Sequence, residues 1–316
     1  MSAPVTVVGA GISGVACARA LQEAGVPVRV LDRGRRPGGR MASRTFADRV
    51  VDTGASYLTA APGSPFAAVV EDWVARGLAR AWTDTFAVAG PGGLEERKSG
   101  PVRYAAPAGL RSLVADLASG LDVVQERTVQ RVADGPSVDG EEVPAAVLAL
   151  PGPQARRLVD DALAGALLDD ADWQPALAVV LGFDRRGWDA DLHGAFVHDD
   201  DAVEWIADDG DRRGDGAPVL VAHTTPTLAA RHLDRPEDAV GAVTAAVARV
   251  LGLAAGPAWT AVHRWTFAKP AAPREEPFGL VGRIGACGDG WSAPSRVQSA
   301  WSSGDALGAA LAGVLR

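Results

Sequence analysis

The chain of 316 residues contains only two cysteines, two methionines, two tyrosines and two lysines. Its cysteines, Cys17 and Cys287, are too few for a disulfide framework. No apolar run reaches about 18 residues without interruption, so we predict no transmembrane helix. The five histidines lack metal-ligand spacing with one another and with cysteine, so we predict no metal site. These histidines are His193, His198, His223, His232 and His263.

An excess of positive charge is absent as well. The chain holds 29 arginines, but 39 acidic residues give it a formal net charge of −8. We therefore expect no general surface for nucleic acid or anionic membranes. The N-terminus lacks a basic region and its apolar run is broken by glycines, so it does not resemble a signal peptide and we expect a cytoplasmic protein. Hydrophobic residues make up 47% of the chain, enough for the core of one or two domains.

Three glycines follow the first apolar run. Residues 5–8 predict a strand, and Gly9, Gly11 and Gly14 come directly after it. In a strand-turn-helix unit the first glycine permits the tight turn, the second lets a pyrophosphate approach the backbone, and the third lets the helix pack closely on the sheet. The turn therefore predicts a phosphate-binding site. Ser13 lacks the Gly-x-Ser-x-Gly spacing of a hydrolase nucleophile, so we predict it as a phosphate ligand.

An acidic residue stands where a dinucleotide-binding unit needs one. The amphipathic stretch 15–24 predicts a helix, residues 26–31 predict a second strand, and Asp32 ends that strand. A carboxylate about 20 residues after the glycines can accept hydrogen bonds from an adenosine ribose. This order of strand, glycines, helix, strand and acid predicts a dinucleotide-binding Rossmann unit. The alternative is a glycine-rich turn in an ordinary α/β domain.

The loop after Asp32 distinguishes FAD from NAD. Gly38 and Gly39 precede Arg40 and Met41 in an arginine-rich loop. An extended FAD needs a second backbone approach beyond the first turn and a cation near its phosphates, and this loop offers both. An NAD-only domain has no such requirement, so we predict FAD. The alternative is a solvated, arginine-rich loop with a turn glycine.

A second pair of glycine and acid lies near the C-terminus. Gly288 and Asp289 stand between a small apolar strand and a long helix that starts near Val297. The aspartate can bind a ribityl hydroxyl or brace the phosphate turn, and the positive end of the helix can stabilise an anionic reduced flavin. A plain turn aspartate is the alternative. The predicted FAD-binding residues are Gly9, Gly11, Ile12, Ser13, Gly14, Asp32, Arg33, Gly38, Gly39, Arg40, Met41, Gly54, Ala55, Gly288, Asp289, Val297, Gln298 and Ala300.

Four residues are predicted to line a substrate pocket. Tyr57 follows a short strand with a Gly-Ala turn that can face a flat ligand, and His223 ends an apolar strand. His263 and Trp265 share a segment with a cation and a second aromatic residue, which suits the wall of an aromatic ligand site. Structural roles stay open, with His223 as a strand cap, His263 as an edge polar residue and Trp265 as core. No residues are assigned as a catalytic acid or base.

Two other groups invite a chemical role. Cys287 has no partner cysteine or base nearby in the sequence, so we expect neither a covalent flavin link nor a redox function, and the FAD is predicted to be noncovalent. The acidic segments 199–201 and 208–215 resemble calcium-binding loops, but Arg213 occupies the third ligand position counted from Asp209. We therefore predict a solvated loop at each segment.

The order of segments predicts an α/β protein with two domains. Several strands between 175 and 268, with a helix at 236–251 among them, indicate a separate sheet rather than further Rossmann repeats. The last segment has the order strand, glycine turn and helix, and returns to the first domain. We predict an FAD-binding Rossmann-like domain made of 1–62, 101–158 and 275–316, and a sheet-based substrate domain made of 63–100 and 159–274.

The chain resembles the renalase branch of the amine-oxidase-like flavoproteins over nearly its whole length. General to that superfamily are the FAD elements 9–14, Asp32, 38–41 and 288–289. More particular to renalases are the segments 52–59, 107–110, 220–226 and 263–270. The resemblance implies a para-hydroxybenzoate-hydroxylase-like, amine-oxidase-like fold, in which a sheet-floored substrate domain covers the flavin ring of an FAD domain.

The resemblance also implies a reaction. Renalase-like enzymes oxidise the 2- and 6-dihydro isomers of NAD(P)H to NAD(P)+ by hydride transfer to flavin N5, and O2 is reduced to hydrogen peroxide. Such a transfer breaks no O–H or N–H bond, so it depends on positioning and electrostatics more than on a general base. The chain departs from the branch at Ser56, where glutamine is usual, at Leu58, where an aromatic residue or isoleucine is common, and at Asp208, where asparagine is frequent.

Two alternatives stay open. An amine oxidase shares the cofactor domain but needs an aromatic cage, which here would have to use tryptophan or phenylalanine because only Tyr57 and Tyr104 are available. The second alternative is a flavin- or NAD-binding module without turnover, although a single glycine fingerprint argues against separate binding of both nucleotides. The expected partners are a dihydronicotinamide and O2, with no nucleic acid and no membrane.

Overall fold

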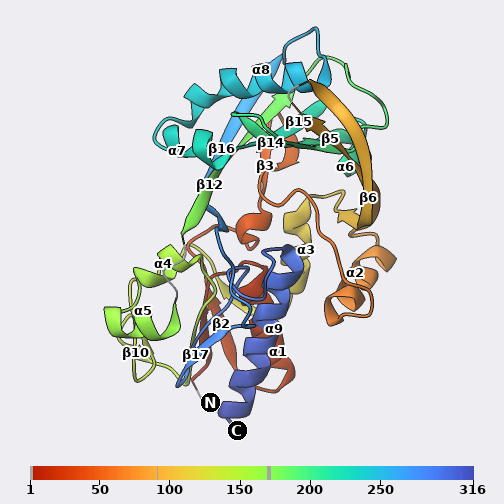
Figure 1. Cartoon of the computed structure of the whole chain (residues 1–316). Coiled ribbons are helices and arrows are strands. Elements are labelled where there is room, and N and C mark those ends of the chain that lie inside the picture. Colours follow the sequence, from red (N-terminus) through yellow and green to blue (C-terminus); the bar gives the residue numbers. More distant parts are fainter. Residues whose placement is uncertain (1–2, 91, 169–171) are drawn as a thin grey trace.

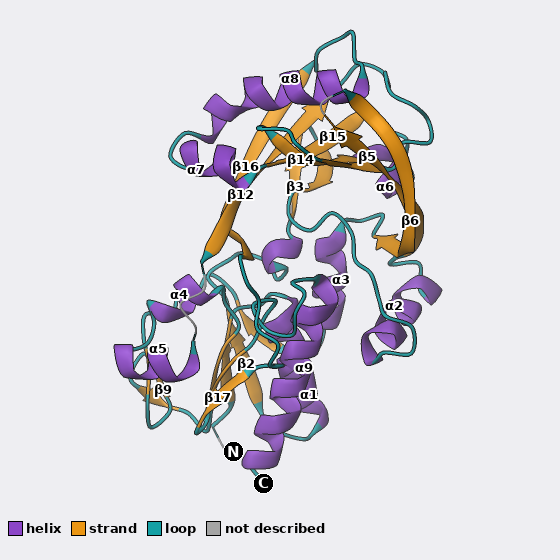
Figure 2. Cartoon of the chain, viewed as in Figure 1, coloured by secondary structure: helices purple, strands orange, loops and turns teal. Residues whose placement is uncertain are grey.

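Two β-sheets, one above the other in Figures 1 and 2, form the frame of the molecule. The computed structural model describes residues 3–90, 92–168 and 172–316. The lower part of the view holds both chain ends and a six-stranded sheet, and the upper part holds a seven-stranded sheet. Strands β12 (Trp173–Gly182) and β16 (Trp259–Pro270) pair with each other and lead from the upper sheet toward the lower part.

The lower sheet has the order β17-β18-β11-β1-β2-β7, with β17 antiparallel to β18 and the other neighbours parallel. Helices α1 (Ile12–Glu23), α3 (Leu110–Leu117) and α9 (Val297–Val314) cover one face, and α4 (Gly152–Arg156) and α5 (Asp161–Leu167) cover the other. The central strands are buried on both faces, as in other parallel sheets enclosed by helices. The strands are β1 (Val5–Val8), β2 (Val28–Leu31), β7 (Asp122–Val124), β11 (Ala146–Leu148), β17 (Gly279–Val281) and β18 (Ile284–Ala286), and a small sheet beside α5 contains β8 (Val132–Ala133), β9 (Ser137–Val138) and β10 (Glu141–Glu142).

The upper sheet has the order β16-β12-β15-β14-β13-β5-β6, with β13 parallel to β5 and the other neighbours antiparallel. Its outer face is covered by α7 (Pro226–Arg231), η2 (Pro236–Ala239) and α8 (Val240–Leu251). The hairpin of β3 (Ser43–Phe46) and β4 (Arg49–Asp52) packs on the opposite, inner face. The remaining strands are β5 (Arg80–Gly90), β6 (Gly93–Ala105), β13 (Gly194–Val197), β14 (Val203–Asp208) and β15 (Val219–Thr224), and the remaining helices are η1 (Gly39–Met41), α2 (Pro65–Ala75) and α6 (Asp209–Arg213).

Helices α1 and α9 approach each other closely because small residues face across their contact. A Cβ atom on Gly304 of α9 would lie 1.9 Å from the backbone oxygen of Ser13 on α1, so only glycine fits there. The contact joins the start of the chain to its end over the buried core of the lower part. Within the described residues, no helix combines the length and apolarity needed to cross a membrane.

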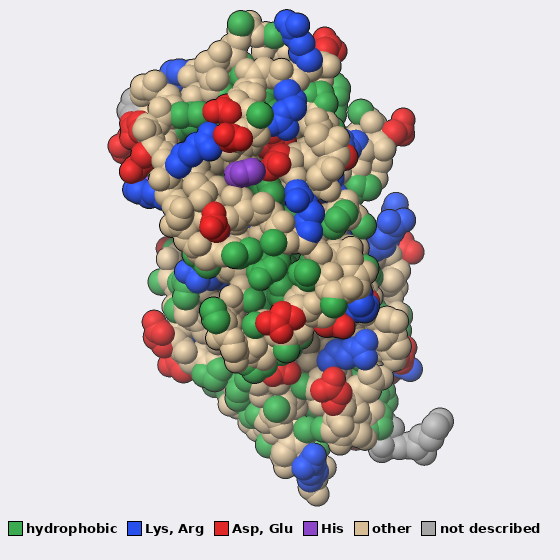
Figure 3. Space-filling view, turned by 90° about the vertical axis from the view of Figure 1, so that its right-hand side faces the viewer, with side chains coloured by type: hydrophobic (Ala, Val, Ile, Leu, Met, Phe, Trp, Pro, Cys, Tyr) green, Lys and Arg blue, Asp and Glu red, His purple; other side chains and the backbone are tan. Residues whose placement is uncertain are grey.

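Basic and acidic side chains are interspersed over the face shown in Figure 3. Many arginines of the chain form ion pairs, among them Arg76 with Asp116 at 2.6 Å and Arg29 with Asp122 at 2.7 Å. Exposed pairs of this kind contribute about 0–1 kcal/mol each. The arginines on this face are therefore distributed among acids rather than gathered into a field of one sign.

The predicted fold class is confirmed, and several element boundaries differ from the prediction. The sequence after Pro151-Gly-Pro153 predicts one helix to about residue 166, but the structure has two. Asp160 caps the second by accepting a hydrogen bond from the Leu163 amide at 2.9 Å. The sequence pattern predicts a strand at 258–265, whereas β16 extends to Pro270. A local pattern finds an element, whereas its end depends on caps and pairing partners.

The cores do not follow the predicted domain boundaries at every point. Helix α2, predicted in the substrate domain, places Trp73 in the core of the lower part, and α5 places Leu163 beneath the lower sheet. The hairpin β3–β4, predicted in the FAD domain, places Val51 against the upper sheet. Strand β6 also continues to Ala105, past the predicted boundary at 101. Sequence order alone does not reveal which core a connecting segment joins.

The contact between α1 and α9 can be tested by adding one methyl group. We expect Gly304→Ala to lower the free energy of unfolding by about 1–3 kcal/mol, because its Cβ would overlap the Ser13 backbone. Gly313→Ala lies in the same helix with no atom within 4 Å of the new Cβ, and should be neutral or stabilising by up to about 1 kcal/mol. Urea unfolding compares the two variants, and equal stability would contradict the close packing.

Candidate functional site

The carboxylate of Asp32 is fixed at the glycine turn by two backbone amides. Its Oδ2 accepts a hydrogen bond from the Ala10 amide at 2.6 Å, and its Oδ1 accepts one from the Gly34 amide at 2.6 Å. A carboxylate has about four acceptor positions, so roughly two remain for a ligand. Asp32 follows β2 directly, as predicted, and its position suits the binding of ribose hydroxyls.

The two glycine-rich turns meet in space. The Gly38 amide donates to the Ala10 carbonyl at 2.8 Å, and a Cβ on Gly39 would lie 3.0 Å from the Gly11 Cα. Gly38 and Gly39 have φ values of 142° and 52°, a region that favours glycine. The structure therefore brings the predicted turns together as one surface of bare backbone, of the kind that a pyrophosphate can approach.

Both helices that start at this surface lack a side-chain cap. Helix α1 begins after Gly11 and α9 after Arg296, and neither N-cap makes a side-chain hydrogen bond to the first turn. By contrast, Ser64 and Asp160 cap α2 and α5 through their side chains. Uncapped N-terminal amides are donors that suit an anion, so these helix starts fit the phosphates and the reduced ring of a flavin dinucleotide.

A half-buried arginine that the sequence analysis missed lies beside this surface. A Cβ on Gly38 would lie 3.1 Å from the Cγ of Arg111, which is on α3. The Nε of Arg111 is buried without a hydrogen-bond partner. Burial, together with Arg44 and Arg36 nearby, holds the pKa of Arg111 below its ordinary value. The unpartnered Nε of Arg111, surrounded by other cations, is suited to an anionic ligand. Nothing in the sequence indicates this role, because Arg111 reaches the site only through its tertiary contact with Gly38.

Arg40 and Asp289, predicted separately, form an ion pair. The Arg40 guanidinium donates to the two Asp289 carboxylate oxygens at 2.8 Å and 2.5 Å. Ser295 also donates to Asp289 at 2.7 Å, and the guanidinium lies over the Trp173 ring at 5.0 Å. The pair joins the η1 loop to the C-terminal glycine turn, so the two predicted FAD elements are fixed relative to each other.

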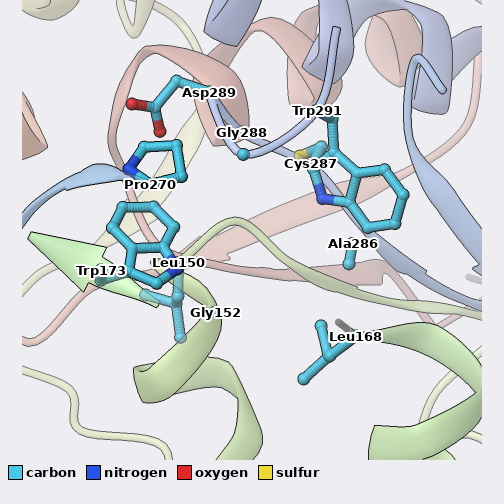
Figure 4. A pocket seen from close by; sticks show the side chains of 11 residues that line it. Leu150, Gly152, Leu168, Trp173, Pro270, Ala286, Cys287, Gly288, Asp289 and Trp291 are labelled. Atoms are coloured by element: carbon cyan, nitrogen blue, oxygen red, sulfur yellow. The ribbon is translucent and has the colours of Figure 1, made fainter. Parts of the chain in front are cut away.

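A cavity opens beside this ion pair. Trp173 and Trp291 line it from different sides, and Gly288 and Asp289 form part of its wall (Figure 4). Pro270, at the end of β16, also lines it. The cavity therefore lies where the two crossing strands reach the C-terminal glycine turn, and it belongs to the predicted cofactor site.

The other predicted cofactor residues contribute in different ways. Ile12, Ser13, Met41 and Ala300 are buried, so their side chains mainly pack within the core. The side chain of Gln298 binds the segment just before α2, because it accepts from the Ala61 amide at 2.9 Å and donates to the Ser64 hydroxyl at 3.2 Å. Arg33 is exposed, and Val297 is the first residue of α9.

Cys287 is a buried, protonated thiol. Burial raises its pKa to about 12, opposed by a hydrogen bond with Ser13. A thiolate is the form that attacks or is oxidised, so this residue is poorly suited to covalent or redox chemistry at neutral pH. The side chain lies in the core next to Gly288.

Aromatic and histidine side chains form a row across the inner face of the upper sheet. Phe196 pairs with Trp205, Trp205 with His223, His223 with Ala178, and Ala178 with His263. Directly paired residues of antiparallel strands point to the same face. The structure therefore brings the predicted residues His223 and His263 onto one surface, together with Phe196 and Trp205, which the sequence analysis missed.

Both histidines of this row are held in the neutral form. Burial, with Arg212 and Lys269 nearby, lowers the pKa of His223 to about 4. Burial, with Arg44 and Arg264 nearby, lowers the pKa of His263 to about 4. The Nε2 of His223 is buried without a hydrogen-bond partner. At neutral pH these rings can therefore exchange hydrogen bonds with a ligand but carry no charge.

Tyr57 joins an aromatic cluster at one end of the row. Its ring centroid lies 5.2 Å from that of Phe86 and 5.8 Å from that of Trp205. Arg103 stacks over Phe86 at 4.4 Å. Burial raises the pKa of Tyr57, opposed by the charges of Arg103 and Arg296. Phe86 and Arg103 were missed because strands β5 and β6 reach this site only through sheet pairing.

Trp265 contacts the predicted Gly-Ala turn. Its indole N–H donates to the Thr53 carbonyl at 2.7 Å, and its ring meets that of His263 edge-on at 4.6 Å between centroids. A Cβ on Gly54 would lie 3.3 Å from the indole. The structure thus places Trp265 between His263 of the upper sheet and the turn that carries Gly54 and Ala55.

The prediction of a solvated loop at 208–215 is wrong. Asp208 caps the short helix α6, and Asp209 and Arg212 of that helix are both 0% exposed. Asp209 pairs with Arg212 at i,i+3 and with Arg213 at i,i+4 within α6. This helical spacing was visible in the sequence, but the segment was compared only with calcium-binding loops. In the other acidic segment, Asp200 pairs with Arg249. Among the described residues, no group of three ligating side chains is arranged to hold a metal ion.

The three departures from the renalase pattern have local structural roles. Ser56 accepts a hydrogen bond from the Trp205 indole at 2.9 Å, and Leu58 is a core residue that is 1% exposed. Asp208 accepts hydrogen bonds from the Trp188 indole and the Asp211 amide, at 2.6 Å and 2.9 Å. Burial raises the pKa of Asp208.

Comparison with known proteins identifies two family models along the chain. The model described as "NAD(P)-binding Rossmann-like domain" matches residues 7–73, and the model described as "Flavin containing amine oxidoreductase" matches residues 94–306. The matching family is flavin-dependent, and the glycine turns, Asp32 and the uncapped helices fit its cofactor. The predicted cofactor, FAD, is thereby confirmed.

Two curated relatives each match about a fifth of the chain. Polyamine oxidase 1 of Oryza sativa subsp. japonica is 44% identical over 71 residues, which are 22% of this chain and 14% of that protein. Protein FLOWERING LOCUS D of Arabidopsis thaliana is 46% identical over 65 residues, 19% of this chain and 8% of that protein. The match thus covers a small part of each relative's length.

Solved structures match the whole chain. A chain from Exiguobacterium sp. 255-15, described as a protoporphyrinogen oxidase, aligns with a TM-score of 0.75 at 14% identity and covers 99% of both chains. Putrescine oxidase bound to putrescine aligns with a TM-score of 0.71 at 15% identity, covering 99% of this chain and 98% of that one. At this identity the likeness establishes the fold.

Loss of the Asp32 carboxylate should weaken FAD binding. We expect Asp32→Asn to raise the dissociation constant of FAD about 10- to 100-fold, because charge-assisted hydrogen bonds contribute about 1.5–3 kcal/mol. Asp122→Asn removes an exposed, ion-paired carboxylate on the neighbouring strand β7 and serves as the control. FAD titration of the apoproteins measures both. Equal affinity in the two variants would refute the role of Asp32.

The neutral state of His223 should make the stability depend on pH. The unfolded chain protonates this residue near its ordinary pKa of 6.5, whereas the folded chain resists protonation down to about pH 4. The unfolded state thus binds more protons in this window, and acidification favours unfolding by up to about 1.4 kcal/mol per pH unit. Between pH 6.5 and 5 the wild type should lose about 1–2 kcal/mol more stability than His223→Gln. Parallel stability curves would contradict this.

Proposed function

Because the chain belongs to the flavin containing amine oxidoreductase family, we propose that it is an FAD-dependent oxidase whose substrates are the 2- and 6-dihydro isomers of NAD(P)H. Bound FAD supplies a two-electron acceptor that O2 can reoxidise with formation of hydrogen peroxide. The products are NAD(P)+ and hydrogen peroxide. The renalase-like segments support this substrate, and so does the chemistry of the inner sheet face.

The residues that would hold FAD span both ends of the chain. Asp32 suits the ribose, and the meeting turns of Gly11 and Gly39 suit the pyrophosphate. The ion pair of Arg40 and Asp289 lies beside them. The uncapped start of α9 suits negative charge on a reduced ring. Asp32 and the uncapped start of α9 offer acceptors and donors to the cofactor, whereas Arg40 and Asp289 are paired with each other and fix the two loops.

The observation that carries the proposed substrate is the charge around the inner sheet face. His223, His263 and Tyr57 are the titratable side chains of the predicted substrate pocket. The charged residues that shift the pKa values of these three side chains are all cations, namely Arg212, Lys269, Arg44, Arg264, Arg103 and Arg296. Two of these cations have acidic partners, Asp209 for Arg212 and Glu204 for Lys269. A positive environment around neutral aromatic groups favours an anionic ligand with a neutral ring. A reduced nicotinamide dinucleotide has both properties.

The absence of an assigned acid and base is consistent with this reaction. Hydride leaves from carbon as the nicotinamide ring becomes aromatic, so no N–H or O–H proton has to be removed. The neutral rings of His223 and His263 can hydrogen-bond and orient a substrate without taking a proton. Trp205 and Tyr57 supply apolar area that excludes water from the ring.

Amine oxidation is the second candidate. The aromatic cluster of Tyr57, Phe86 and Trp205 could surround an alkyl amine, and two similar proteins have polyamine oxidase and putrescine oxidase in their names. Glu204, beside the row, offers a carboxylate for an ammonium group. That carboxylate is paired with Lys269 at 3.1 Å, which reduces its attraction for a cation. The charges therefore favour the dihydronicotinamide.

Anaerobic mixing separates these candidates. We expect the 2- and 6-dihydro isomers of NADPH to bleach the visible flavin absorbance of the FAD-loaded protein at least about tenfold faster than ordinary NADPH or putrescine. Admission of oxygen should then restore the absorbance and release hydrogen peroxide. Fast bleaching by putrescine without bleaching by the isomers would establish the amine candidate instead. No bleaching by any of them would favour a binding module without turnover.

A further inference from the structure

The turn from Asp52 to Ser56 receives side-chain donors from the upper part of the molecule. The Arg212 guanidinium donates to the Ser56 carbonyl at 3.0 Å and to the Asp52 carbonyl at 3.3 Å. The Trp265 indole donates to the Thr53 carbonyl between them, at 2.7 Å. Arg212 lies on α6 and Trp265 on β16, so two elements distant in sequence donate to three carbonyls of one turn.

A third donor reaches the same turn. The indole of Trp205, on β14, donates to the Ser56 hydroxyl at 2.9 Å, and this contact is buried. Trp205 also belongs to the row of aromatic and histidine side chains on the inner sheet face. Its position therefore ties the turn directly to the predicted substrate surface.

The opposite side of the turn packs against the cofactor loop. The Ala55 amide donates to the Arg40 carbonyl at 2.9 Å, and a Cβ on Gly54 would lie 1.9 Å from the same oxygen. Only glycine permits this approach. Any shift of the turn is therefore passed on to Arg40, whose side chain holds Asp289.

A network of buried charges fixes Arg212. Asp209 accepts from Arg212 at 2.5 Å, and it also pairs with Arg213 at 3.2 Å and with Arg49 at 2.9 Å. Burial would raise the pKa of Asp209, but the guanidiniums of Arg212 and Arg213 outweigh it and hold the pKa below its ordinary value. Arg213 in turn lies 3.2 Å from the Asp52 carboxylate. The orientation of Arg212 is thus set by charges that cannot relax into water.

We propose that Arg212, Trp265 and Trp205 are positioning residues that set the distance between the cofactor loop and the substrate face by holding the turn from Asp52 to Ser56. They act through the turn and through Arg40. The inference depends on the FAD chemistry of the proposed function but not on the identity of the reductant. Small displacements matter here because a shift of about 1 Å in a reacting pair can cost about 100-fold in rate.

The experiment compares variants that remove one donor each. Arg212→Lys keeps the buried charge but cannot reach both carbonyls, Trp265→Phe removes the donor to Thr53, and Trp205→Phe removes the donor to Ser56. We expect each to weaken FAD binding to the apoprotein about 3- to 30-fold and to shift the visible flavin spectrum. Neither measurement needs a substrate, so both test the positioning role even if the dihydronicotinamide isomers prove not to be the reductant.

Arg49→Gln is the matched control. Arg49 pairs with Asp209 and Asp215 in the same network but donates to none of the turn residues Thr53 to Ser56. We expect it to lower the melting temperature while leaving the FAD dissociation constant and the spectrum unchanged. Wild-type affinity and spectrum in Arg212→Lys and Trp265→Phe would overturn the proposal. Equal weakening of FAD binding in Arg49→Gln would overturn it too, because stability alone would then explain the effect.

Discussion

The buried guanidinium of Arg212 is the contact on which the arrangement of this molecule depends. It joins α6, which connects β14 to β15 of the upper sheet, to the backbone turn that packs on the cofactor loop. Removing one partner from such a buried ion network typically costs about 3–5 kcal/mol, because it leaves a charge uncompensated. The same guanidinium contributes to the positive field at His223. Position of the cofactor loop and charge at the substrate face are therefore linked through one side chain.

Burial and positive charge act together at the substrate face. Each lowers the pKa of His223 and of His263, so both rings are neutral through the physiological range. A neutral histidine surrounded by arginine and lysine favours an anionic ligand without acting as a base. In the function we propose, these neutral rings orient the substrate for hydride transfer, a step that depends on positioning and electrostatics.

The sequence predicted those parts of the site that depend on short-range motifs. Asp32, the glycine turns, Arg40 and Asp289 each follow from a few residues in a fixed order, and the structure brings them together. The row through Trp205 and His223 could not be predicted in full, because strand register is set by tertiary pairing and not by spacing along the chain. Helix α6 was misread since charged residues are usually exposed, and the burial of its Arg212 depends on carbonyls that are 156 and 160 residues away.

Hydrogen exchange of the apoprotein tests the central claim most directly, since it reports on the turn without cofactor or substrate. The account predicts that the Thr53 and Ala55 amides, which donate to the Ala42 and Arg40 carbonyls, are protected in the wild type and in Arg49→Gln measured below its melting transition. The same amides should exchange at least about tenfold faster in Arg212→Lys and in Trp265→Phe, while α1 and β1 keep their protection. Unchanged protection of the Thr53 and Ala55 amides in both of these variants would contradict the claim that side chains of the upper sheet hold the cofactor-facing turn.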